Sequence, residues 1–205
     1  YSANDISEWN GIYTGKYKTL INVPISIASA LAASSVPALT AAYTNGKKEA
    51  VRSQINTAIR FIMVVAFPCA VGMGVLASPI LQLLFRDSSE LAASMLQLGA
   101  VSIVFFSLST LSNGLLQGIN RMREPVKNAL IALVLHIGLL VVLMYAFQLN
   151  IYAVVYANAF FGLLMCVLNA YSVKKYSGYR QEIRRTFVIP GISALIMGVA
   201  VYLSY

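Results

Sequence analysis

Six long apolar stretches, separated by short polar breaks, dominate this sequence. About 20 consecutive apolar residues cross the hydrocarbon core of a bilayer as a helix. The stretches are continuous and do not alternate between apolar and polar residues, which favours helices over the strands of a membrane barrel. The sequence therefore predicts an all-α polytopic membrane protein with six transmembrane helices, at about residues 20–43, 61–84, 91–116, 126–147, 151–173 and 187–205.

Charge is distributed unevenly among the breaks. The chain is 59% hydrophobic and only 11% charged, too apolar for an ordinary soluble domain, yet it has a net charge of +8. Eleven of the fifteen Lys and Arg residues fall in three alternate breaks, at residues 45–52, 121–127 and 174–185. Because cytoplasmic loops accumulate Lys and Arg, we expect these three breaks inside the cell and the other two outside. This distribution accounts for the net charge without a nucleic-acid partner.

The first residues are polar and lack the apolar core of a signal peptide. We expect residues 1–19 to form an outer loop and the entry to the first span, and residues 20–205 to form the six-helix bundle. The chain begins on Tyr1 and ends on Tyr205, directly after an apolar run. The sequence is therefore interpreted as a segment of a larger polytopic protein that works with an absent partner half.

Cations at the edges of the spans are the first candidate binding residues. Lys16 and Lys18 enter the first predicted span from outside, and Arg60 enters the second from inside. Such side chains either extend to the headgroups or face a watery cavity, where they bind an anion. Arg60 also shares a helical face with Arg52 and Asn56, a face suited to an anionic headgroup or to the anionic leaflet itself. Both interpretations stay open.

A polar stripe runs along the third predicted span. Its members fall within about 60° of one another on a helical wheel. Such a stripe lines an aqueous path or bonds to neighbouring helices. As candidate substrate contacts we take Ser102, Ser109, Asn113 and Gln117. A thinner stripe in the fifth span favours helix packing and comprises Asn158, Gly162, Cys166 and Asn169.

Other reactive side chains are few. His136 lies near the middle of the fourth predicted span, and without a carboxylate in any span a neutral, hydrogen-bonded imidazole is favoured over a proton relay. Cys69 and Cys166 are expected at different depths, as buried free thiols without metal-ligand spacing. The sequence has no nucleophile with its base and no phosphate-cradling glycine loop. We therefore expect no enzyme activity, no catalytic residue, no metal and no cofactor.

The second predicted span contains residues that weaken a helix. Pro68 removes an intrahelical hydrogen bond, and Gly72 and Gly74 follow about one turn later. We interpret these three residues as a candidate hinge. Static packing is the alternative, because Gly and Pro are frequent in membrane helices.

Several motifs follow one another in a recognisable order. They are Pro24–Ile27, Ser34–Leu39, Phe67–Ile80, Leu83–Phe85 and Leu115–Arg121 with Pro125 after it. This order resembles the carboxy-terminal lobe of bacterial lipid-linked polysaccharide flippases, which belong to the multidrug/oligosaccharidyl-lipid/polysaccharide exporter superfamily, also called the MOP superfamily. The SpoVB and MurJ-like branch is the most similar.

The resemblance implies a two-lobe transporter of about fourteen helices, in which this chain supplies helices eight to thirteen. The lobes rock around a central cavity and move an undecaprenyl-pyrophosphate-linked saccharide across the bacterial cell membrane. Lys18 stands where the family has a cavity-facing Arg, so the resemblance implies substrate contact there. The implied partners are a lipid-linked anionic saccharide, membrane lipid and the missing amino-terminal lobe.

Two other functions stay open. One is a cation-coupled multidrug antiporter of the same superfamily, which would be expected to carry a carboxylate within a span. No predicted span has one. The other is a structural membrane subunit of envelope assembly that transports nothing.

Overall fold

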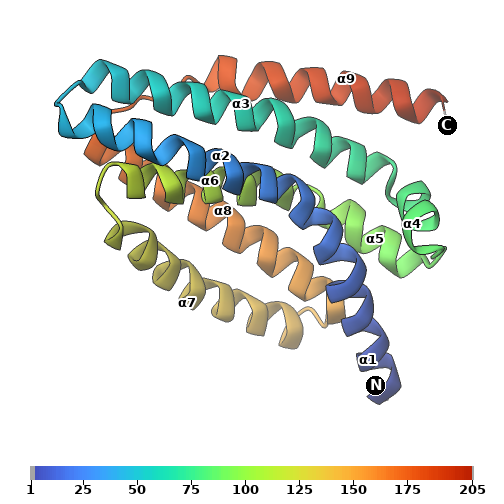
Figure 1. Cartoon of the computed structure of the whole chain (residues 1–205). Helices are drawn as coiled ribbons and strands as arrows, with labels where there is room; N and C mark the ends of the chain where they lie inside the picture. Colours follow the sequence, from blue (N-terminus) through green and yellow to red (C-terminus); the bar gives the residue numbers. More distant parts are fainter. Residues whose placement is uncertain (1–2, 205) are drawn as a thin grey trace.

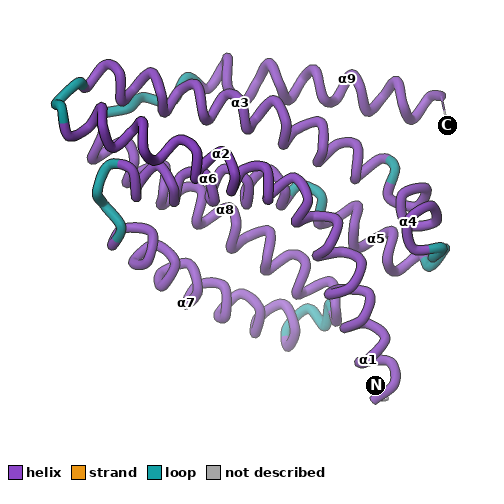
Figure 2. The backbone as a smooth tube through the Cα atoms, viewed as in Figure 1, coloured by secondary structure: helices purple, strands orange, loops and turns teal. Residues whose placement is uncertain are grey.

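The computed structural model describes residues 3–204, with side chains from residue 6 on, and every element in this range is helical (Figures 1 and 2). The prediction of an all-α polytopic membrane protein is confirmed. The α-helices, with two π-helical segments η1 and η2, are α1 (Ala3–Gly11), η1 (Ile12–Tyr17), α2 (Lys18–Thr44), α3 (Lys48–Val75), α4 (Ala77–Phe85), α5 (Glu90–Gly99), α6 (Ser102–Gly118), α7 (Arg123–Tyr145), α8 (Asn150–Ser177), η2 (Arg184–Val188) and α9 (Ile189–Ser204).

The long helices form an elongated bundle with distinct ends. The connections α2–α3, α6–α7 and α8–η2 gather at one end, and the described chain begins and ends at the other (Figure 1). These three connections are the basic ones of the sequence, so we call this end the basic end. In a protein that crosses a membrane six times, alternate loops must lie on the same side, and these three connections do so. The cytoplasmic orientation of the basic end stays a prediction.

Among the described residues, five helical segments are long and apolar enough to cross a membrane, and six if the bent pair α5 and α6 counts as one span. The first such segment is Ile6–Thr44, because α1, η1 and α2 follow one another without a break. Residues 1–19 were expected to form an outer loop and span entry; residues 3–19 are helical in this structure, and Tyr1 and Ser2 lie outside the described residues. Ile12 and Tyr17 are buried against the bundle, and this packing stabilises the added turns.

The second and third spans differ from their predicted limits. Helix α3 ends at Val75, and the residues expected to complete it form the separate helix α4. The third span bends by 47° between α5 and α6. There Ser102 Oγ donates to the Gly99 carbonyl at 2.6 Å, and the Ile103 N–H bonds to Ala100 three residues back. These local bonds replace the α-helical ladder and produce the bend.

Helix α6 is the centre of the bundle, and its glycines let α2 approach closely. A Cβ on Gly114 would lie 2.6 Å from that of Ala32, and one on Gly118 would lie 2.9 Å from Leu39 Cδ2. The Thr40 hydroxyl donates to the Gly118 carbonyl at 2.9 Å across the same contact. Small residues at four-residue spacing are typical of close helix pairs in membranes, where lipid gives no hydrophobic drive for association.

Helix α7 packs mainly against α8 and is held there by polar groups. Asn128 Nδ2 donates to Asn169 Oδ1 at 2.9 Å and to Ser172 Oγ at 3.1 Å. Near mid-helix, His136 Nδ1 lies 2.9 Å from the Ala157 carbonyl and the ring meets Phe161 edge-on. One ring nitrogen of His136 thus has a hydrogen-bond partner on α8. The two cysteines are free and half-buried.

Candidate functional site

A cavity of about 300 Å³ lies between α2, α6 and α8, at the end of the bundle opposite the basic end. We call it the outer cavity. Its wall combines an ammonium, amides and hydroxyls with aliphatic and aromatic side chains. The lining residues are Tyr13, Tyr17, Lys18, Ile21, Asn22, Ile25, Ser102, Phe106, Asn158 and Phe161.

The wide turn of η1 arranges the aromatic wall of the outer cavity. The Lys18 N–H bonds to the Tyr13 carbonyl, five residues back, and the Tyr13 and Tyr17 rings stack with centroids 5.3 Å apart. The Asn158 amide donates to the Tyr13 hydroxyl, and the Tyr17 side chain hydrogen-bonds to Ser102. Aromatic side chains from the first span are thereby fixed against α6 and α8.

Gly99 provides the space for this arrangement. A Cβ at Gly99 would overlap the Tyr17 ring, so only glycine leaves room for the tyrosine. The bend between α5 and α6 and the seat of Tyr17 therefore occur at the same point. π-turns and helix breaks of this kind are frequent at functional sites.

Lys18 is the cation of the outer cavity. Its Nζ lies 5.1 Å from the centroid of the Tyr13 ring, a cation–π contact. No carboxylate pairs with Lys18 among the side chains that the structure describes. Asn22 and Asn158 add amide groups to the same wall. An unpaired ammonium beside amides is suited to bind an anion with hydroxyl substituents, and it requires no covalent chemistry.

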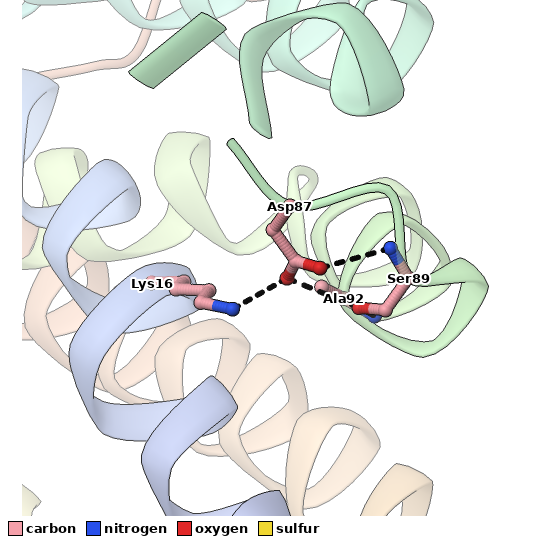
Figure 3. A network of polar contacts seen from close by, with 4 residues as sticks. All are labelled: Lys16, Asp87, Ser89 and Ala92. Carbon is pink, nitrogen blue, oxygen red and sulfur yellow. Dashed lines mark hydrogen bonds and ion pairs between the residues drawn. The ribbon is translucent and has the colours of Figure 1, made fainter. Parts of the chain in front are cut away.

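Lys16 lies two residues earlier and has a different partner. Its Nζ meets Asp87 Oδ2 at 2.5 Å, in the connection between α4 and α5 (Figure 3). Asp87 also accepts from the Ser89 backbone N–H at 2.9 Å, and Ser89 Oγ accepts from the Ala92 N–H at the start of α5. The hydrogen bond from Lys16, followed by that from the Ser89 N–H, lowers the pKa of Asp87. Lys16 therefore fastens the α4–α5 connection to the first span and does not line the outer cavity.

The polar stripe of the third span divides in two. Ser102 lines the outer cavity. Further along α6, Asn113 Oδ1 accepts from Asn169 Nδ2 at 2.7 Å, and the same amide lies 3.4 Å from the Ser109 carbonyl. With Asn128, these groups form a network that joins α6, α8 and α7, as the interhelical alternative describes. Gln117 is exposed near the basic end, so the structure does not gather the stripe into one site.

Arg60 lies away from the outer cavity. Its Nη2 is 3.4 Å from Glu182 Oε2, in the connection between α8 and η2. On the same face, Asn56 Oδ1 accepts from the Tyr179 hydroxyl at 3.1 Å, while Arg52 is exposed. The predicted basic face therefore exists, but a neighbouring loop covers part of it.

Several lining residues were not predicted as substrate contacts. Tyr13 and Tyr17 have the sequence signature of an interfacial belt, and Asn158 belongs to the stripe interpreted as helix packing. The η1 turn, which the sequence does not reveal, and the hydrogen bond from Asn158 to Tyr13 bring these residues to one cavity with Asn22. Asn22 is a lone amide in an apolar stretch, and this feature of the sequence could have marked it as a candidate substrate contact.

The candidate hinge lies within an unbroken helix. Pro68 is inside α3, which continues to Val75. No atom would contact a Cβ on Gly72, and one on Gly74 would make an ordinary contact with Ala100 at 3.7 Å. Hinge motion stays a prediction. Within the described residues no cluster of His, Cys, Asp or Glu could hold a metal ion.

Comparisons with known proteins agree on one family. The family model described as "Lipid II flippase MurJ" matches residues 18–205. "Lipid II flippase MurJ" of Bacillus subtilis (strain 168) is 29% identical over 195 residues, which are 93% of this chain and 35% of that protein. "Probable lipid II flippase MurJ" of Bdellovibrio bacteriovorus is 26% identical over 212 residues, which cover 100% of this chain and 40% of that protein.

The chain spans well under half the length of these relatives. No solved structure matches it. The family match covers α2 to the end of the chain, including α2, α6 and α8 around the outer cavity, while Tyr13 and Tyr17 of η1 lie before the matched residues. On this match and on its membrane-spanning helices, the chain belongs to the lipid II flippase MurJ family.

Proposed function

We propose that this chain forms part of one lobe of a flippase that moves a saccharide linked to a polyprenyl diphosphate across the bacterial cell membrane. In this proposal the outer cavity takes the anionic part of the cargo, and Lys18 provides the positive charge. Both relatives are named for lipid II, and cargo of that class has the required diphosphate and sugar hydroxyls. The two lobes would expose the cavity alternately to each side.

One observation carries the proposal. Lys18 lies in a cavity with amides and hydroxyls, and no described carboxylate neutralises it. An antiporter for cationic drugs would be expected to place a carboxylate there, and a purely structural subunit would need no such cavity. Lys16 differs from Lys18 in this respect, because Asp87 already neutralises Lys16.

The test replaces the charge of Lys18 in the full-length protein. Lys18→Arg should keep most of the flipping of a fluorescent polyprenyl-diphosphate saccharide in proteoliposomes. Lys18→Gln should reduce it by about tenfold or more, because one charge-assisted contact to phosphate contributes about 1.5–3 kcal/mol. Full activity of Lys18→Gln would refute the assignment of the outer cavity.

Lys16→Gln is the matched control. It removes the same charge two residues away, at a site that the structure pairs with Asp87. Flipping by Lys16→Gln should stay near wild type. An equal loss in both variants would mean that general charge at this end, and not the cavity, supports transport.

A further inference from the structure

The basic end contains a second candidate anion site, distinct from the outer cavity. Two adjoining cavities of about 460 and 580 Å³ lie between the start of α3 and the end of α8. They share Arg52 and Gly178, so we treat them as one feature, the basic groove. Its lining includes the cations Lys48, Arg52 and Arg180 and the carboxylate Glu182.

Arg52 lines both cavities and lies beside a glycine. Gly178 has a φ of +63°, and its missing side chain leaves space for the guanidinium. A Cβ at Gly178 would lie 2.7 Å from Arg52 Nη2. The turn that ends α8 thus leaves open the space into which this arginine extends.

The cations of the groove are not neutralised. No ion pair or side-chain hydrogen bond joins Lys48, Arg52 or Arg180 to a described residue. Glu182, the carboxylate of the lining, is already paired with Arg60. Glu49 is exposed in the first turn of α3 and is not part of the lining. The groove therefore has an excess of positive charge for a ligand to balance.

Two further features favour an anion. The N-terminus of α3 borders the groove, and no side chain caps it. Free N–H groups and the helix dipole at such an end attract anions. On the other wall, Arg121 lies 4.5 Å and Lys175 lies 5.3 Å from the ring centroid of Tyr176, which brings more positive charge to the same place.

The groove lies at the level where lipid headgroups are expected. The candidate span Lys48–Val75 lines the groove with its first residues, and the candidate span Asn150–Ser177 lines it with its last residues. Tyr43, Tyr176 and Tyr179 stand in its wall, and tyrosines are enriched where a bilayer meets water. A phosphate that reaches this depth on an acyl-anchored molecule meets the groove without leaving the membrane.

We propose that the basic groove binds the phosphate of an anionic glycerophospholipid from the adjacent leaflet. Arg52 and Lys48 provide the charge, and Arg52 offers the planar pair of donors that suits phosphate. The bound lipid ties the start of α3 to the end of α8 at the basic end. This site is independent of cargo binding in the outer cavity.

The test measures lipid retention by the full-length protein. The protein is reconstituted in nanodiscs of phosphatidylcholine with a minor fraction of phosphatidylglycerol, and the lipid that stays bound is counted by native mass spectrometry. The variant Lys48→Gln with Arg52→Gln should retain phosphatidylglycerol about 30-fold more weakly, since each of the two cations near an anionic surface contributes about 1 kcal/mol. Arg52→Lys keeps the charge and should fall between this variant and wild type.

The matched control is Arg123→Gln with Lys174→Gln. It removes two cations from the same end of the bundle, outside the groove lining. Retention by the control should stay close to wild type. Equal losses in the two double variants, or no loss in the groove variant, would overturn the proposal, because retention would then follow general charge or another site.

Two more measurements identify the source of the phosphate. A photoreactive phosphatidylglycerol should label the segments 43–52 and 176–182, and labelling elsewhere alone would refute the site. Inorganic phosphate at millimolar concentration should not displace the lipid. Complete displacement would mean that the groove takes soluble phosphate. Thermal unfolding of each variant in pure phosphatidylcholine shows whether it is folded, and the labelled positions in the wild-type protein do not depend on any variant.

Discussion

The exposed faces of α2 and α7 differ in side-chain size, although both helices belong to candidate membrane spans. From Ser29 to Ala41 the exposed residues of α2 are alanines and serines, with Pro37 and Thr40 among them, and no large hydrophobic side chain is exposed there. The exposed large side chains of α7 between Val126 and Met144 are all Val, Leu, Ile or Met. Helix α9 is similar to α7 in this respect.

The difference indicates what covers each face. Bulky aliphatic side chains are suited to acyl chains, while small residues allow another helix to approach or leave room for water. The buried side of α2 already shows the first use, because it packs on Gly114 and Gly118 of α6. The chain spans 35–40% of its curated relatives, so we expect the free face of α2 to meet another part of the full protein or its aqueous path.

The largest expected effect is on the packed side of α2. Gly114→Leu places a side chain where Ala32 already lies, so we expect destabilisation of about 3 kcal/mol or a failure to fold. Gly138→Leu on α7 is the control, because nothing lies within 4 Å of its Cβ position. Thermal unfolding in detergent measures both. Equal stability of the two variants would refute the close α2–α6 contact.

The role of the free face of α2 can be tested with a large side chain at an exposed position, where it clashes with nothing inside this chain. Ala33 is exposed, so Ala33→Trp should leave the unfolding temperature nearly unchanged. Flipping by the full-length protein should fall by about tenfold or more, which corresponds to about 1.4 kcal/mol, because the indole would fill space that another part of the full protein or its aqueous path needs. Val134→Trp, at an exposed position of α7, should change neither quantity. If Ala33→Trp transports normally, the free face of α2 contacts only lipid.

The fold was predictable to the extent that it depends on hydropathy and charge. The helical class and the family resemblance are confirmed. The η1 turn and the bend at Gly99 were not predictable, because they depend on the contact of Tyr17 with a residue more than 80 positions away. Local sequence specifies a helix at both places, and tertiary packing changes its geometry.

The candidate site was also predictable only where it depends on local sequence and not on tertiary contacts. Lys18 and Ser102 could be chosen from the sequence because a cation and a hydroxyl are unusual in an apolar span, and both line the outer cavity. Lys16 had the same signal, but its contact with Asp87 depends on how the α4–α5 connection folds back. Arg60 was equally ambiguous until the loop after α8 placed Glu182 beside it. Which of these residues touch cargo stays a prediction.

The hinge prediction concerns a smaller effect. Pro68→Ala with Gly72→Ala restores one helical hydrogen bond and adds a methyl group where the structure has open space. The stiffer helix should slow flipping severalfold while cargo binding stays unchanged. Spin labels on α3 and on the rest of the full protein should report a narrower distance distribution. Unchanged rates and distances would mean that these residues, with Gly74, serve packing alone.

The smallest expected effect is on the ion pair of Lys16 and Asp87, which holds the α4–α5 connection against the first span (Figure 3). Both side chains are partly accessible to solvent, so the pair should contribute at most about 1 kcal/mol.

The pKa of Asp87 is lowered below its ordinary value of 3.8, chiefly by Lys16. When the pKa of a carboxyl is lower in the folded state than in the unfolded state, the carboxylate stabilises the fold at every pH above the unfolded-state pKa. This stability is lost as the pH falls through the folded-state pKa. Asp87→Asn should therefore unfold slightly more easily than wild type between about pH 5 and 8, and the difference should vanish only in acid below the lowered, folded-state pKa of Asp87. A difference that persists in acid would show that the charge of Asp87 is not what fastens the connection, and Ser89 at the start of α5 would then be the next residue to test.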